Sequence, residues 1–235
     1  MEHSAEIWQN ELRKIANEEK AVILRRFFKT GKGEYGEGDV FIGITVPQNR
    51  EIAKTKFSLP YSAFDTMLES DIHEFRLSAL LALVIKFKKE KDKRKEIVDF
   101  YLNRTKACNN WDLVDLSAPY ILGEYLLTNP NPALLDSLSL SSNMWEQRIA
   151  IVCTLTLIRH GMFEDTLRLA ERYLPHPHPL IHKATGWMLR EIGKKNIDVL
   201  RSFLDLFTPQ MPRTALRYAI EKMDSVERTH YMNVK

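Results

Sequence analysis

Helical segments of one kind recur along the chain, and this recurrence constrains the fold more than any other feature. Each segment places a basic residue just before a run of small and apolar residues, and these basic residues are Arg76, Arg148, Lys183 and Arg213. The segment around Trp111 falls midway between the first two. A spacing in the thirties of residues, with two helices in each unit, is typical of an α-solenoid of the HEAT or armadillo type. The sequence therefore predicts an all-α fold of stacked helix pairs with a concave surface.

Weaker helical patterns fill the intervals between these segments. We expect helices over 49–57, 61–68, 93–102, 132–138, 163–173 and 197–207. A further helical pattern begins behind Ser4 as a cap and continues to Phe27, before the glycine-rich loop 31–38. This loop lacks the Lys-Ser/Thr ending of a phosphate-binding P-loop, so we interpret it as a connector. We interpret the lysine-rich run over 86–95 as a solvated linker between two helices.

Length and composition exclude several classes of protein. With 235 residues the chain is long enough for a sizeable core, and we expect one domain over 1–235. The net charge is only +3, so binding to nucleic acid would depend on local positive charge. Two cysteines, Cys108 and Cys153, predict neither a disulfide framework nor a zinc site, which fits the cytoplasm. The sequence shows neither an apolar run of about 18 residues nor a signal peptide, so we expect no membrane association.

A tryptophan and an aspartate four residues apart are the first candidate functional residues. Trp111 and Asp115 would lie one turn apart on the same face of a helix. Neither Asp112 nor Asp115 has a basic residue three or four positions further along. A buried carboxylate without a partner is strongly penalised, whereas a carboxylate beside an indole ring can hold a cation. Taken singly, each residue is better explained as a core or solvated side chain, but together they favour a cation-binding site.

A second tryptophan, Trp187, is surrounded by basic residues. Lys183 precedes it by four positions, Arg190 follows it by three, and Lys194 lies one turn further along. A basic rim around an acidic and aromatic centre suits a polyanion that carries a cationic group, and DNA with a positively charged lesion has this chemistry. The histidines of the proline-rich segment 175–179 lack a third ligand, so we interpret this segment as a stiff loop and predict no metal site.

The spacing of four motifs resembles the AlkD-like DNA alkylation repair family, whose members are DNA glycosylases built from HEAT-like repeats. These motifs are Trp111-xxx-Asp115, Trp145-xx-Arg148, the stretch 183–191 and the stretch 41–50, and the resemblance extends from about residue 6 to about residue 225. It implies a concave basic groove for duplex DNA and the excision of N3- and N7-alkylated purines without base flipping. Carried over to this chain, the catalytic cleft would contain Trp111, Asp115 and Trp187, and Arg148 would contact the DNA backbone.

The chemistry of the lesion agrees with this resemblance. Alkylation at N3 or N7 makes a purine cationic, so the base can leave without a general acid, and the developing oxocarbenium-like sugar needs stabilisation. A fixed carboxylate in an aromatic cleft provides it. We therefore expect a monomeric, monofunctional enzyme in the cytoplasm at the nucleoid, without cofactor, with Lys183, Arg190 and Lys194 on the DNA. The alternatives are a non-catalytic HEAT-like module that binds altered or branched DNA, and a protein-binding scaffold.

Overall fold

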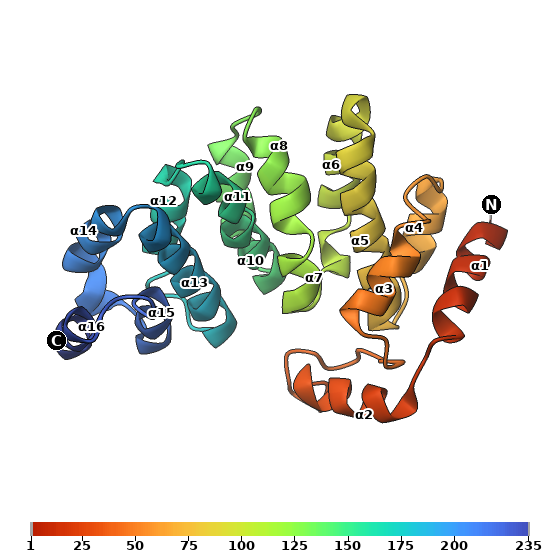
Figure 1. Ribbon diagram of the computed structural model, residues 1–235, viewed down its shortest axis with the longest axis horizontal. Coiled ribbons are helices and arrows are strands. Elements are labelled where there is room, and N and C mark those ends of the chain that lie inside the picture. The colour runs from red at the N-terminus through yellow and green to blue at the C-terminus, as the bar shows by residue number, and fades with distance from the viewer. Residues whose placement is uncertain (1, 235) are drawn as a thin grey trace. The chain divides into compact units, whose positions relative to one another are not determined.

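The structure is a computed structural model that describes residues 2–234, and the regular structure in this range is almost entirely helical (Figure 1). The one exception is an isolated bridge between Val40 and Ile72. Successive helices pack against their neighbours as pairs, so the all-α helical-repeat fold predicted from the sequence is confirmed. No helix in the described range is both long and apolar enough to cross a membrane.

The chain divides into two compact units, Met1–Ser117 and Ala118–Lys235. The expectation of a single domain stays a prediction. The helices of the first unit are α1 (Glu2–Arg13), α2 (Glu18–Phe27), α3 (Val46–Ala53), α4 (Tyr61–Leu68), α5 (His73–Lys89), α6 (Arg94–Leu102) and α7 (Trp111–Asp115), with short 3-10 turns η1 (Lys91–Lys93) and η2 (Thr105–Ala107). Those of the second unit are η3 (Pro119–Gly123, a π-helix), α8 (Glu124–Leu126), α9 (Pro132–Ser139), α10 (Met144–Val152), α11 (Thr154–Arg159), α12 (Glu164–Arg172), α13 (Pro179–Lys195), α14 (Ile197–Phe207), the 3-10 turn η4 (Thr208–Gln210), α15 (Arg213–Ala219) and α16 (Ser225–Asn233).

The long helix α5 forms the centre of the first unit. It packs against α3 and α4 and is buried along most of its length, because its sequence is apolar on nearly every face. The indole N–H of Trp8, from α1, donates a hydrogen bond of 2.9 Å to the hydroxyl of Ser78 on α5. Both side chains are fully buried, so each satisfies the other's polar group.

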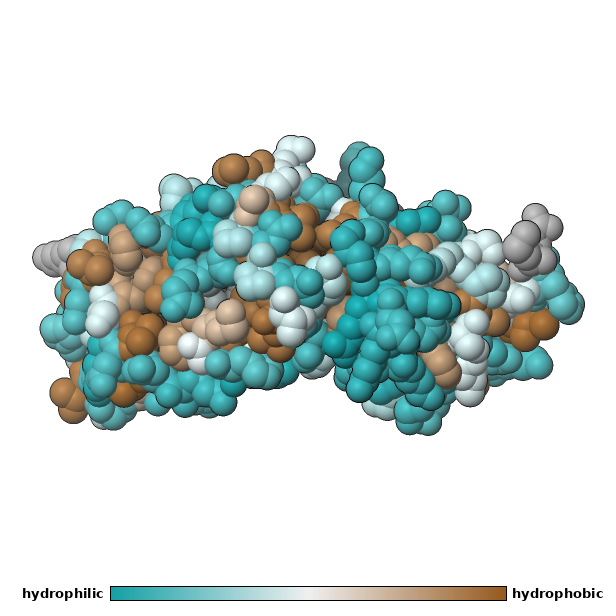
Figure 2. Space-filling model, turned by 90° about the horizontal axis from the view of Figure 1, so that it is seen from above, coloured by the Kyte–Doolittle hydropathy of each residue, from teal (hydrophilic) through white to brown (hydrophobic). Residues whose placement is uncertain are grey.

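The helix α13 has the same central position in the second unit, where it packs against α10, α11, α14 and α15 (Figure 1). Its contact with α15 is close because Gly186 has no side chain. A Cβ atom at this position would lie 2.3 Å from the carbonyl oxygen of Ala215. On the face shown in Figure 2, many of the side chains are hydrophilic, and hydrophobic side chains lie among them.

The N-terminal helical pattern is interrupted, contrary to the prediction. The first helix begins at Glu2, ahead of Ser4, and ends at Arg13; α2 begins after Asn17, whose side chain accepts an N–H of its first turn. Gly43 approaches this junction with a φ of +84°, and a Cβ there would lie 1.9 Å from the carbonyl oxygen of Asn17. This tertiary contact fixes the break between the two helices.

The lysine-rich run over 86–95 is also different from the prediction. Its first part is the last turn of α5, and only 6% of Lys86 is exposed. The Lys86 ammonium donates to Glu90 Oε1 at 2.8 Å and to the carbonyl oxygen of Phe57 at 3.2 Å. The helix dipole favours cations at a helix C-terminus, so the lysines in the last turn of α5 stabilise the end of this helix.

Candidate functional site

The short helix α7 carries Trp111 and Asp115, as expected, and both side chains are partly exposed. Asn110 is the N-cap of this helix, and its side-chain oxygen accepts a hydrogen bond of 2.9 Å from the backbone N–H of Trp111. Leu113 and Val114, between the two candidate residues, are fully buried and anchor the helix in the core. The sequence pattern thus places an indole and a carboxylate one turn apart at the surface of the first unit.

A column of aromatic rings supports Trp111 from beneath. The Trp111 ring stacks on Phe28 with centroids 5.1 Å apart, Phe28 stacks on Phe41 at 5.0 Å, and Phe41 stacks on the His73 imidazole at 4.4 Å. The ring of Phe27, which is 60% exposed, meets the Trp111 indole edge-on at 5.8 Å. The column fixes the plane of the indole, and it extends the aromatic surface onto α2.

A buried ionic network lies at the base of this column. His73, which is 1% exposed, has Nδ1 at 3.1 Å from Asp39 Oδ2 and Nε2 at 2.9 Å from Asp112 Oδ2. Asp39 Oδ1 also accepts from Arg76 Nη2 at 2.6 Å and from Asn109 Nδ2 at 2.8 Å. The network joins the end of the glycine-rich loop to the first turn of α7, and with two cations facing two carboxylates its charges balance.

The histidine at the centre of the network is a cation. Burial lowers the pKa of His73, but the carboxylates of Asp112 and Asp39 outweigh burial and raise this pKa to about 9. Burial raises the pKa of Asp39, but hydrogen bonds from His73 and Asn109 and the charge of Arg76 hold it below its ordinary value. Both imidazole N–H groups therefore donate to carboxylates at neutral pH.

The two aspartates of α7 have different environments, which the sequence pattern did not predict. Asp112 is 4% exposed and pairs with His73, a residue 39 positions away. Its lack of a basic partner within one helical turn is therefore no sign of function. Asp115, by contrast, is partly exposed.

The stretch 41–50, which contributes to the family resemblance, is organised around a second buried carboxylate. Glu74 is 1% exposed, and its Oε1 accepts backbone N–H groups from Ile42 at 3.1 Å, Gly43 at 2.8 Å and Ile44 at 3.2 Å. Several N–H donors satisfy the buried charge and shape the turn that precedes α3. This stretch thus has a structural explanation that sequence reasoning missed.

In the second unit, α13 carries Trp187 and the predicted basic rim. The Trp187 ring is partly exposed, and its N–H donates to Glu191 Oε1 at 3.2 Å. Lys194 Nζ lies 2.7 Å from the same carboxylate oxygen, and Arg190 forms an ion pair with Glu221. Two of the three predicted cations around Trp187 are therefore paired with acids, which reduces the positive charge of this rim.

Lys183 and Arg148 have opposite environments. Lys183 is exposed on the first turns of α13. Arg148, on α10, is only 5% exposed, and its Nη1 donates to the carbonyl oxygen of Leu180 at 2.7 Å. This bond joins α10 to the N-terminus of α13, as expected of an arginine that holds neighbouring helices. The predicted contact of Arg148 with DNA stays a prediction.

The histidines of the proline-rich loop form hydrogen bonds that shape the loop. His176 Nε2 lies 2.8 Å from Gln147 Oε1, and His178 Nδ1 accepts the N–H of Leu180 at 3.2 Å, which caps α13. Within the described residues, no group of three or more histidine, cysteine or acidic side chains is arranged to hold a metal ion. The two histidines therefore have structural roles, His178 as the cap of α13 and His176 as a hydrogen-bond partner of Gln147.

The four residues predicted to form the catalytic cleft and to contact the DNA backbone beside it divide between the two units. Trp111 and Asp115 belong to the first unit, whereas Arg148 and Trp187 belong to the second. Each unit presents one partly exposed tryptophan next to a carboxylate, Asp115 in one and Glu191 in the other. That the residues of both units meet around one ligand stays a prediction.

These features define an all-α helical-repeat protein with partly exposed indole and carboxylate pairs. The chain belongs to the family of DNA alkylation repair enzymes, because the model of that family matches residues 8–223. This membership supports a role in the repair of alkylated DNA.

Two solved structures are similar to this chain. One is described as a predicted DNA alkylation repair enzyme from Enterococcus faecalis; it has 20% identity and a TM-score of 0.66, covering 89% of this chain and 97% of that chain. The other is smu.31 from Streptococcus mutans, with 20% identity, a TM-score of 0.54, and coverage of 76% and 93%. At this identity the likeness shows the fold alone. No curated protein matches the sequence.

Proposed function

We propose that the protein is a monofunctional DNA glycosylase that releases cationic N3- or N7-alkylated purines from duplex DNA. The observation that carries this proposal is the pairing of Trp111 with Asp115 on α7, at the surface and above a fixed aromatic column, in a chain of the DNA alkylation repair family. DNA with alkylated bases is the substrate, and the protein acts as a monomer at the nucleoid in the cytoplasm.

The reaction depends on charge that the lesion itself supplies. An alkylated purine is cationic and leaves as a neutral base, so no general acid is required. As the glycosidic bond lengthens, positive charge moves onto the sugar, and the carboxylate of Asp115 stabilises it. A water molecule then adds to the anomeric carbon of the sugar and releases a proton to solvent, which completes the hydrolysis. The indole faces of Trp111 and Trp187 add cation–π attraction of roughly 0.5 to 2 kcal/mol. Because the enzyme acts on the sugar, the base need not be flipped into a pocket.

Positively charged side chains hold the DNA backbone around this cleft in our proposal. Lys183 is exposed and suits a phosphate contact, while Arg190 and Lys194 would exchange their acidic partners, Glu221 and Glu191, for phosphate. Glu191 then stays beside Trp187 as a second carboxylate near the lesion. Arg148 would also contact the DNA backbone, in addition to its hydrogen bond with the carbonyl oxygen of Leu180.

The decisive experiment replaces Asp115 by asparagine and measures the release of 7-methylguanine under single-turnover conditions. Asp115→Asn keeps the shape of the side chain but removes its charge, so the rate should fall by about 10²- to 10³-fold, as for other lost electrostatic contacts in active sites. Asp99→Asn is the matched control, because Asp99 is also a partly exposed aspartate of the first unit and its carboxylate pairs with Lys95. The control should release the base at the wild-type rate.

The same assay, run beside a gel-shift assay, separates the alternatives. Near wild-type excision by Asp115→Asn would refute the mechanism. Binding of methylated duplex without base release by the wild-type protein would identify a non-catalytic DNA-binding module. Absence of both binding and release would favour a protein-binding scaffold.

A further inference from the structure

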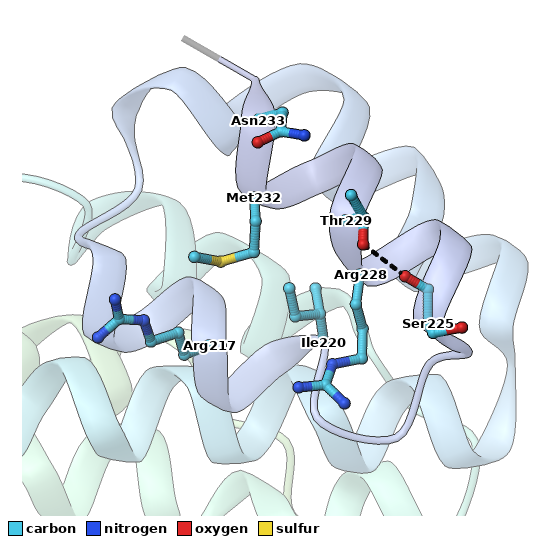
Figure 3. Close-up of a pocket in the computed structure, with 7 residues that line it drawn as sticks. All are labelled: Arg217, Ile220, Ser225, Arg228, Thr229, Met232 and Asn233. Atoms are coloured by element: carbon cyan, nitrogen blue, oxygen red, sulfur yellow. Dashed lines mark hydrogen bonds between the residues drawn. The ribbon is translucent and has the colours of Figure 1, made fainter.

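A pocket of about 570 Å³ lies between α15 and α16 in the second unit (Figure 3). Its floor is apolar, formed by Ile220 and Met232, and the guanidinium groups of Arg217 on α15 and Arg228 on α16 stand on either side of this floor (Figure 3). Both arginines are exposed. None of the described residues that line the pocket is acidic.

Neither arginine forms an ion pair or side-chain hydrogen bond with another described residue, although acids are plentiful nearby. Each acid is engaged elsewhere. Glu221 pairs with Arg190 and Lys222, and the Glu227 carboxylate accepts from Arg201 Nε at 2.7 Å. Asp224 caps α16, with its Oδ1 at 2.8 Å from the N–H of Val226. Among the described residues, the two guanidinium groups that line the pocket therefore have no acidic partner.

The pocket is held in shape by contacts at both ends of α16. Arg213 Nη2 donates to the carbonyl oxygen of Met232 at 2.5 Å, which joins the start of α15 to the end of α16. The Tyr231 hydroxyl donates to Asp205 Oδ1 at 2.9 Å, and the ion pair of Glu227 with Arg201 also connects α16 to α14. A ligand thus meets preformed walls, which reduces the entropic cost of binding.

We infer that this pocket binds the phosphodiester backbone of a nucleic acid strand, with one phosphate at Arg217, one at Arg228 and the intervening sugar over Ile220 and Met232. Guanidinium groups bind phosphate oxygens in pairs of hydrogen bonds, and the Asn233 amide at the rim adds a further donor. Two separated charges with an apolar floor between them fit a strand better than a single small anion.

The position of the pocket in the second unit supports this ligand. The helix α15 sits directly on α13 through the close approach at Gly186, and α13 carries Lys183 and Trp187. The pocket is thus one helix pair beyond the proposed DNA-binding helix. The inference rests on the proposed function in taking DNA as the ligand, but it concerns binding alone.

The test measures binding of a short undamaged duplex by fluorescence anisotropy over a series of salt concentrations. The variants are Arg217→Gln, Arg228→Gln and the double substitution. Each phosphate contact releases about 0.9 counterions from the DNA when the protein binds. Each single substitution removes one contact and should raise Kd about eightfold at about 0.1 M salt. The double substitution should make the slope of log Kd against log salt concentration shallower by about 2. Arg159→Gln is the control, because Arg159 is an exposed arginine of the same unit.

Several outcomes would overturn the inference. Unchanged Kd and slope in the double variant would do so, as would an equal effect of Arg159→Gln, which would indicate net charge alone. A slope restored by Arg217→Lys supports a phosphate contact, because lysine keeps the charge. Binding of inorganic phosphate at this pocket, followed by nuclear magnetic resonance and without any change in the DNA slope, would assign a free phosphate instead. Since undamaged DNA is used, failure of base release by the wild-type protein is a separate result.

Discussion

Replacing His73 should abolish one specific pH dependence of stability. The pKa of this histidine is about 9 in the folded protein, against an ordinary value of 6.5 for a histidine side chain. Between these two values the folded chain keeps a proton that the unfolded chain has lost. The free energy of unfolding should therefore be highest below pH 6.5 and fall by about 1.4 kcal/mol per pH unit up to pH 9, a total of about 3 kcal/mol.

The other groups with shifted pKa values change the free energy of unfolding mainly outside the range from pH 6.5 to pH 9. Burial lowers the pKa values of His176 and His178, so their contribution to the pH dependence lies below pH 6.5. The pKa of Cys108 is raised by burial from 9.0 to about 12, so its contribution begins where that of His73 ends. The pKa of Asp39 is lowered, so its stabilisation is present at neutral pH and is lost only in acid.

The measurement is urea unfolding of the full chain, followed by circular dichroism at several pH values between 6.5 and 9. In His73→Gln the slope against pH should disappear, and at neutral pH the variant should be less stable by roughly 3 to 5 kcal/mol, because Asp39 and Asp112 lose a buried cation. His230→Gln, at an exposed histidine, is the control and should keep the wild-type slope. An identical slope in wild type and His73→Gln would refute the assignment of a charged His73.

The remaining predictions concern the proposed reaction. Neutral lesions such as uracil or hypoxanthine should be released poorly in matched duplexes, since the positive charge of the leaving base drives the proposed reaction. Comparable single-turnover rates for neutral and cationic lesions would indicate a general acid that protonates the leaving base. Arg148→Ala should weaken binding to damaged and undamaged duplex alike and make the salt slope shallower by about one unit. A lower melting temperature with an unchanged salt slope would instead assign Arg148 a structural role, through contacts such as its bond to Leu180. Trp187→Ala should slow excision with little change in affinity for undamaged DNA, and a wild-type rate would remove this ring from the cleft.

Local patterns predicted most of the helices because amphipathic periodicity is a property of short segments. The expected ranges 61–68 and 197–207 coincide with α4 and α14. The second of these is capped by Asn196, whose side chain accepts the N–H groups of Asp198 and Val199. The break between α1 and α2 was missed because its cause is distant: Gly43 contacts the junction from 26 positions further along the chain.

The candidate site was predictable in part for the same reason. The pairing of Trp111 and Asp115 follows from helix geometry, and the structure has that helix. The partners of Asp112 and Asp39 could not be found, because a histidine such as His73 at the start of an apolar helix gives no sign of which distant acids it will contact. The pairing of Arg190 with Glu221 is likewise a contact between two helices. Charge counted along the sequence therefore overstated the basic rim.

The length of α7 has a consequence for transferring this chemistry to another protein. A helix of five residues is far too short to be stable in isolation, so the angle between the Trp111 ring and the Asp115 carboxylate is set by what holds the helix. These supports are the aromatic column from Phe28 to His73, the ion pair of Asp112 with His73, and the buried side chains of Leu113 and Val114. Grafting Trp-xxx-Asp onto a long helix that is stable by itself would reproduce the spacing of the two residues, but not the contacts that fix the orientation of their side chains. A designer would need to transplant α2, the glycine-rich loop and the start of α5 as one piece.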